Sequence, residues 1–198
     1  MNASLRDVAR RIEAGVKSEH VTLGALAVVV GGLAGGGAIV FRYAIDAAQI
    51  AVFWEAGALA DIARALPFWH VLLAPTLGGL VIGILCVHVL PGPQPQGVAQ
   101  VIEANALRNG RLSARQGLGA AVVNALAIGA GGSVGREGPI VHVGATLAST
   151  VARRLGLGAS LARTLLGCGV AAAVASAFNA PIAGVFFALE VVIGHYAL

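Results

Sequence analysis

Charged and aromatic side chains are scarce in this sequence of 198 residues, at 11% and 5% respectively. A soluble domain carries about 25% charged residues, so this chain has too few to cover a water-facing surface. Hydrophobic residues make up 58% of the sequence, and its mean hydropathy is +0.86. These figures exclude a soluble enzyme, a nucleic-acid-binding protein and a disordered chain. We expect an integral membrane protein whose surroundings are the lipid bilayer.

Cysteine is also rare, since only Cys86 and Cys168 are present, each within an apolar stretch. We interpret both as small packing residues and not as a disulfide or a metal-binding pair. We find no spacing typical of a zinc site, a phosphate-binding loop or a nucleophile–base pair. The sequence therefore predicts no enzymatic activity, no metal and no cofactor.

Glycine, in contrast, is abundant, with 28 residues. That is about twice the usual share of roughly 7%. Small residues let membrane helices approach closely, where no hydrophobic force draws them together. Gly31 and Gly35, and likewise Gly32 and Gly36, form small-xxx-small pairs that we expect at helix contacts.

Runs without charge are long enough for membrane helices, which need about 20 residues to cross a bilayer. These runs cover residues 21–41, 71–87, 116–135, 138–152 and 164–189. The sequence therefore predicts an all-α fold, a polytopic membrane helical bundle.

The first 20 residues differ from the rest, because they carry seven charges and no apolar run. We expect residues 1–20 to be a cytoplasmic amphipathic N-terminus, with a short helix over 4–17 at the membrane surface, followed by a membrane domain over 21–198. A solvated polar segment is the alternative interpretation of residues 4–17. The basic residues here and in a later connector favour a cytoplasmic side under the positive-inside rule, and we expect the cell (inner) membrane. These residues are Arg6, Arg10, Arg11, Lys17, Arg108, Arg111 and Arg115.

Two segments interrupt the apolar pattern. Residues 91–97 read PGPQPQG, which no helix tolerates, and a short helix is predicted over 98–107. A glycine-rich break follows at 131–138. Broken, re-entrant helices are tolerated in membranes where they line a cavity, and in transporters they mark the ion or substrate site.

The second break has the residue types of an anion site. Four glycines within 131–138 unwind the chain, and Pro139 suits the first turn of a new helix. The first N–H groups of that helix have no helical partner and form an anion-binding nest, to which Arg136 adds positive charge. Glu137 can occupy this site when ionised and leave it when protonated. The alternative role of Glu137 is a structural ion pair with Arg136.

Two motifs carry a family resemblance. Residues 135–139 read GREGP, and residues 177–190 read AFNAPIAGVFFALE. Both resemble signatures of the CLC chloride channels and chloride/proton antiporters, the second matching that family's FNAP-x-AG-xx-F-xx-E stretch. The resemblance covers residues 21–198 and is to the N-terminal half of the family fold, the first of two inverted repeats.

The resemblance implies roles for individual residues. Glu137 matches the external gating glutamate, and the backbone around it matches the segment that binds the outer anion, which is chloride or a similar anion. The family's first filter stretch, GSGIP, corresponds to residues 95–99, where Gln96 replaces the serine that contacts the central anion. The anion-binding residues implied are Gln96, Gly97, Val98, Gly135, Arg136, Gly138 and Pro139.

Glu190 and Val191 are residues of a possible ion path, and they indicate whether anion transport is coupled to protons. In the proton-exchanging members, the glutamate matching Glu190 is followed by a second glutamate, whereas Val191 is found here, as in channel-type members. We therefore favour channel-type or loosely proton-coupled anion transport over strict chloride/proton exchange.

The second repeat of the family fold supplies another filter stretch and a tyrosine, neither of which these 198 residues contain. We therefore expect the family's homodimer only when the second repeat is attached. The family arrangement places Arg153, Arg154 and Arg163 outside the cell, whereas the charge rule favours the cytoplasm, and the sequence leaves their topology open.

Other functions stay open at this point. The chain could be a truncated membrane scaffold without transport, or an unrelated broken-helix transporter in which Glu137 binds a cation or proton. Among the single polar residues, we expect Asn124 and Asn179 bonded to backbone groups inside the bundle. We expect His142 in the core, with contact to Glu137 as the alternative. Glu190 is expected to be buried near the cytoplasmic side, and a helix-end or packing role and a role in ion movement both stay open for it.

Overall fold

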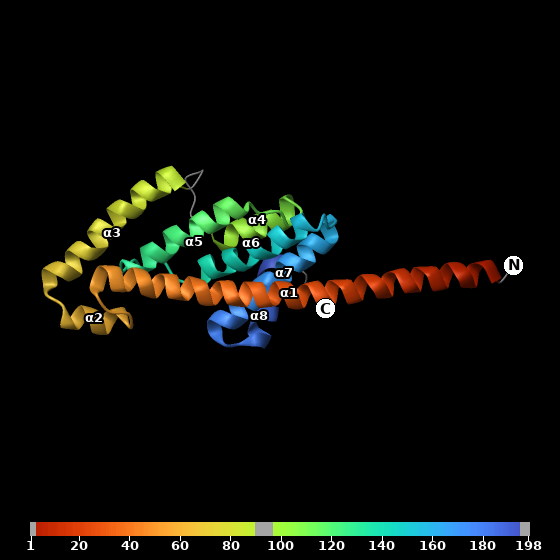
Figure 1. Ribbon diagram of the computed structural model, residues 1–198, viewed down its shortest axis with the longest axis horizontal. Coiled ribbons are helices and arrows are strands. Elements are labelled where there is room, and N and C mark those ends of the chain that lie inside the picture. Colours follow the sequence, from red (N-terminus) through yellow and green to blue (C-terminus); the bar gives the residue numbers. More distant parts are fainter. Residues whose placement is uncertain (1–2, 90–96, 195–198) are drawn as a thin grey trace.

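The protein is entirely helical in the part that the computed structural model describes, residues 3–89 and 97–194 (Figure 1). Within these ranges there is no strand, as the sequence predicts. The helices are α1 (Ala3–Phe53), α2 (Leu59–Ala65), α3 (Phe68–Val89), α4 (Val98–Leu107), α5 (Ala114–Gly129), α6 (Glu137–Arg154), α7 (Ala159–Phe178) and α8 (Pro181–Phe187), which continues as a π-helical segment, η1 (Ala188–Ile193).

Three helical stretches are long and apolar enough to cross a bilayer: Val21–Phe53, Phe68–His88 and Ala159–Phe178. The predicted short helix over 98–107 is present as α4. Most of the proline-rich segment before α4 lies outside the described residues. With these spans, the chain is an integral membrane protein.

Helix α1 is longer than the sequence predicts, because residues 4–17 do not form a separate short helix. They continue into the first span within one 51-residue helix. No proline or run of glycines stands between Lys17 and Val21, so nothing in the sequence ends the helix there.

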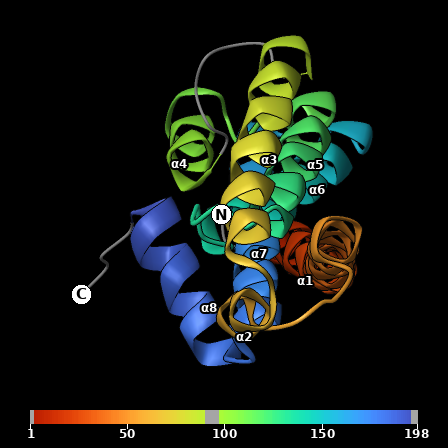
Figure 2. The ribbon, with the colours of Figure 1, turned by 90° about the vertical axis from the view of Figure 1, so that its left-hand side faces the viewer.

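Small residues bring α1, α5, α6 and α7 together. A Cβ on Gly144 of α6 would lie 2.5 Å from the carbonyl oxygen of Gly169 on α7, and a Cβ on Gly169 would meet the Gly144 oxygen at the same distance. Figure 2, which looks along α1, shows α7 with α1 on one side and α4 and α8 on the other. Helix α7 is therefore the centre of the bundle.

Only part of the predicted glycine contacts on α1 is found. Gly31 faces Ala172 of α7, and the Ser176 hydroxyl donates to the Gly35 carbonyl oxygen over 3.5 Å. Gly32 and Gly36 have open space where their side chains would be, so the expectation of a helix contact at this pair is wrong within this chain. The two pairs lie on adjacent faces of α1, and only one face meets α7.

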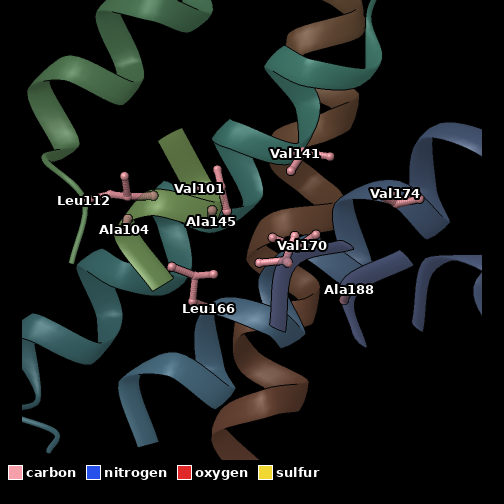
Figure 3. Close-up of a cluster of buried hydrophobic side chains, with 10 residues drawn as sticks. Val101, Ala104, Leu112, Val141, Ala145, Leu166, Val170, Val174 and Ala188 are labelled. Atoms are coloured by element: carbon pink, nitrogen blue, oxygen red, sulfur yellow. The ribbon is translucent and has the colours of Figure 1, made fainter. Parts of the chain in front are cut away.

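A buried cluster joins α4 and η1 to the central helices (Figure 3). The Asn105 amide nitrogen on α4 donates to the Val192 carbonyl oxygen over 3.0 Å, which fixes η1 against α4. The apolar members are Val101, Ala104, Leu112, Val141, Ala145, Leu166, Val170, Val174, Ala188 and Val192.

The uncharged run over 164–189 is not one helix, because the chain turns back after α7. Asn179 adopts a left-handed conformation with φ of 52°, and Pro181 begins α8. Gly184 of α8 then packs closely on α7 at Ala171 and Ala175. Asn179 is exposed, so its role is this backbone turn and not the bonding inside the bundle that we expected.

The connectors α4–α5 and α6–α7 are joined at one end of the bundle. The Arg153 guanidinium donates to the Leu112 carbonyl oxygen over 3.0 Å. The Arg163 guanidinium donates to the Asn109 side-chain oxygen, also over 3.0 Å. Basic residues of both connectors are thereby gathered on the same side.

This end lies beside the start of the first span. Buried residues of α6 and α7 that flank their connector pack against Leu23 and Leu26 of α1. Arg153, Arg154 and Arg163 therefore lie at the same end of the bundle as the start of the first span, and the side of the membrane that this end faces stays a prediction. Helix α6 runs from the glycine-rich break toward this end, and α7 returns from it.

The contact between Gly144 and Gly169 predicts the outcome of a small substitution. Gly144→Ala should lower the free energy of unfolding by about 1–3 kcal/mol, because the new methyl group meets a backbone oxygen that cannot move aside. Thermal unfolding of the detergent-purified chain measures the change. Gly79→Ala on α3, where a Cβ meets nothing within 4 Å, is the matched control. Equal stability of the two variants would contradict the packing described.

Candidate functional site

The glycine-rich break between α5 and α6 is built by backbone conformations that favour glycine. Helix α5 ends at Gly129, and Gly131 and Gly135 have φ of 94° and 74°. L-residues with a side chain rarely adopt such angles. The Gly132 N–H donates to the Ala127 carbonyl oxygen and closes the end of α5. The chain then remains non-helical until Glu137.

Helix α6 begins at Glu137 with its first N–H groups available. The first intrahelical bond at this end runs from the Ile140 N–H to the Arg136 carbonyl oxygen, and Pro139 has no N–H to present. The N–H groups of Glu137 and Gly138 therefore have no helical acceptor. Together with the helix dipole, they make the start of α6 favourable for negative charge.

The Glu137 side chain folds back over this break. A Cβ added to Gly135 would lie 2.8 Å from Oε2 of Glu137, so the carboxylate sits against the Gly135 backbone. Within the described part of the chain, Glu137 makes no salt bridge with Arg136, and both side chains are exposed. The alternative role of Glu137, a structural ion pair with Arg136, is not found.

The start of α4 lies directly against the start of α6. A Cβ on Gly138 would be 3.7 Å from the Gly97 Cα and 4.0 Å from the Val98 nitrogen. These are ordinary van der Waals distances, so the two helix starts are in direct contact. The Gly97 N–H is already bonded to the Gln100 side-chain oxygen over 2.7 Å, which caps α4. Two helix N-termini, with their positive dipole ends, therefore meet at Gly97 and Gly138.

A cavity of about 310 Å³ opens beside the break. Its walls come from α1, from the start of α6 and from the end of α7, and it contains both Arg136 and Glu137. Ser176, Ala177 and Phe178 close it at the end of α7. The second sequence motif thus borders the same space as the first.

The structure thus brings together most of the predicted anion-binding residues. Gly97 and Val98 lie against Gly138, whereas Gln96 falls outside the described residues. Pro139 is buried in the first turn of α6, as predicted.

Glu190 and Val191 lie elsewhere, on η1. Both side chains are exposed, so the expectation that Glu190 is buried is wrong for this chain. The π-helical segment turns Val192 and not Glu190 toward α4.

The other single polar residues have structural roles. His142 is buried at 2% exposure, and its Nδ1 is 3.5 Å from the Thr146 hydroxyl one turn along α6. The Asn124 amide donates to the Ala120 carbonyl oxygen over 2.8 Å. The buried position of His142 and the backbone hydrogen bond of Asn124 agree with the sequence analysis. Cys86 and Cys168 are free thiols on α3 and α7.

One residue of the cavity was not identified from the sequence. Arg42 of α1 lies in its wall with Arg136, although the two are far apart along the chain. The available indication was a basic residue that follows the uncharged run over 21–41 directly, four positions before Asp46. Its neighbours in space could not be predicted, because they depend on how α1 crosses α6 and α7.

Comparison with known proteins agrees with this architecture. The family model described as voltage gated chloride channel matches residues 78–198. A putative chloride channel protein ClcB-like of Ralstonia nicotianae is 40% identical over 163 residues, which cover 79% of this chain and 37% of the relative. The voltage-gated ClC-type chloride channels ClcB of Yersinia pestis and of Escherichia coli O139:H28 are 32% and 31% identical, and the matches cover 70% and 85% of this chain.

The chain spans only about two fifths of the length of these relatives, 37%, 34% and 41% respectively. The family model nevertheless covers more than half of the chain, including both of its motifs. This protein belongs to the voltage gated chloride channel family.

Proposed function

We propose that this chain forms part of a membrane protein that transports chloride or a similar anion, and that the anion binds at the start of α6. The observation that carries the proposal is the meeting of two helix N-termini at Gly97 and Gly138, with the Glu137 carboxylate folded over the same break. The relatives, which are named as chloride channels, support the choice of anion.

The free N–H groups of Glu137 and Gly138 are the proposed anion ligands. Unpaired donors at a helix start bind anions without the dehydration of a cationic side chain. The dipoles of α4 and α6 add favourable potential at the same point, and Arg136 extends it toward the cavity. Gly135 and Pro139 act by shaping the break and not by direct contact.

Glu137 is the proposed gate. Its carboxylate carries the same charge as the transported anion and already lies against the break. An ionised carboxylate can take the place of the anion, and a protonated one loses the attraction that holds it there. Opening would therefore depend on the external proton concentration.

Anion selectivity is proposed to depend on the start of α4. The Gly97 N–H is bonded to Gln100, so Val98 offers the first backbone N–H without a helical acceptor. Gln96 replaces the serine of the family's filter. A carboxamide N–H₂ group also donates to anions, but it is longer and carries an acceptor as well.

We favour channel-type or loosely coupled transport over strict chloride/proton exchange. A proton path needs titratable groups or water at intervals, and Val191 provides neither. A strict antiporter is the alternative, in which Glu190 or water replaces the missing carboxylate. A membrane scaffold without transport has no physical need to retain the motif at residues 135–139.

The arrangement of basic residues supports an orientation. The arginines of both connectors lie at the end of the bundle where residues 1–20 join the first span. Under the positive-inside rule this end faces the cytoplasm, with the membrane domain over 21–198 in the inner membrane. The homodimer is proposed for the chain joined to a second repeat.

Glu137→Gln is the direct test of the gate. The variant is made in the longest chain that carries these residues and is reconstituted in liposomes. Chloride efflux should become largely independent of external pH, because a neutral amide no longer competes with the anion for the site at the start of α6. Glu55→Gln, an exposed carboxylate in the α1–α2 connector, should keep the pH dependence of the unmodified protein. A Glu137→Gln protein with unchanged pH dependence would remove Glu137 from the gating role.

Proton coupling is tested separately in the same liposomes. With a chloride gradient and equal pH on both sides, we expect chloride efflux without sustained uphill proton movement. A pH-sensitive dye inside the vesicles reports the protons. Proton transport at a fixed ratio to chloride would show strict exchange and contradict the channel-type proposal.

A further inference from the structure

Two arginines from distant parts of the chain line two adjoining cavities. Arg42 of α1 and Arg136 of the break both border the 310 Å³ cavity that contains Glu137. They also border a second cavity of about 440 Å³, where Asp46 and Gln49 of α1 are found. Ile45 belongs to both walls, so the two spaces are neighbours along α1.

Neither guanidinium is held by a carboxylate. The salt bridges in the described part of the chain join Arg64 to Asp61 and Arg108 to Glu103, and neither involves Arg42 or Arg136. Asp46 follows Arg42 by one helical turn, but an acid placed C-terminal to its basic partner is the weaker order for a helical pair. Both arginines therefore keep their hydrogen-bond donors available to a ligand.

The charge balance of the first cavity changes with the state of the gate. With Glu137 in place, two guanidinium groups face one carboxylate. When Glu137 is neutralised or moves away, two positive charges remain without a negative partner in that wall. Asp46 lies only in the second cavity. The first cavity is therefore most attractive to an anion when the gate is open.

We propose that Arg42 and Arg136 form an outer collecting site, which binds a monovalent inorganic anion before it reaches the start of α6. Guanidinium groups stay charged at all physiological pH values and are weakly hydrated, so they give up water readily to an anion. A cavity with walls of one charge raises the local concentration of the counter-ion. The role of this collecting site in transport rests on the proposed function, whereas the attraction of the two arginines for anions does not.

Flux measurements test the role of Arg42 by charge changes of opposite sign. Arg42→Gln should raise the chloride concentration for half-maximal flux by about threefold to tenfold. Maximal flux should stay within about twofold, because the α6 ligands are unchanged. Asp46→Asn should shift the half-maximal concentration downward. Arg42→Lys keeps the positive charge but is more strongly hydrated, so it should raise this concentration less than Arg42→Gln does. Arg64→Gln, on exposed α2, is the matched control and should change neither value.

A second measurement does not depend on transport. Ser176 lines the first cavity and is exposed, so Ser176→Cys places a reporter thiol there in a background with Cys86→Ser and Cys168→Ser. An anionic methanethiosulfonate should label this thiol faster than a cationic one. Adding Arg42→Gln should reduce the rate of labelling by the anionic reagent about threefold or more, and it should raise the rate of labelling by the cationic reagent.

The two measurements separate failure of this inference from failure of the proposed function. Labelling that prefers the anionic reagent and depends on Arg42, in a protein without chloride flux, supports the collecting site and contradicts anion transport. Chloride flux whose half-maximal concentration is unchanged by Arg42→Gln, with labelling rates also unchanged, overturns the collecting site and leaves anion transport intact.

Discussion

The proposed anion site depends on the unpaired N–H groups at the start of α6. The N–H groups of Glu137 and Gly138 have no helical acceptor and lie at an exposed break, where they can donate to an anion. Glycines with left-handed backbone at Gly131 and Gly135 hold the chain open, and Pro139 prevents the helix from extending backward by one more bond. The Glu137 carboxylate lies within the same space, as the chemistry of the donors would favour.

Close packing of small residues makes this geometry possible. The starts of α4 and α6 meet at Gly97 and Gly138, and Gly144 and Gly169 bring α6 against α7 deeper in the bundle. Side chains at Gly144 and Gly169 would push α6 away from α7, whereas Gly97 and Gly138 lie at ordinary van der Waals distance from each other. The abundance of glycine is therefore tied to the site as well as to the fold.

Much of the fold could be predicted from composition and local pattern. The apolar runs, the breaks and the short helix over 98–107 follow from hydropathy, proline and glycine, which act locally. The unpaired N–H groups at the start of α6 could also be predicted, because they are a property of any helix start. The resemblance to the CLC family rests on motifs that lie within these same local features.

Features that depend on how helices cross could not be predicted in this way. Arg42 borders the same cavity as Arg136 only because α1 passes beside the break, and Arg153 reaches the α4–α5 connector only because α6 points toward the start of the first span. The turn at Asn179 was missed because no charge marks it, although the Asn-Ala-Pro sequence disfavours a continuous helix. The exposure of Gly32 and Gly36 likewise depends on which face of α1 meets α7.

The most direct test of the central claim is the position of a bound halide. Crystals of the Glu137→Gln protein soaked in bromide should show an anomalous peak within hydrogen-bond distance of the Gly138 backbone nitrogen. Under the same conditions, the unmodified protein should show a weaker peak, because the Glu137 carboxylate competes for the position. Bromide bound only elsewhere, with no peak at the start of α6 in either protein, would contradict the account.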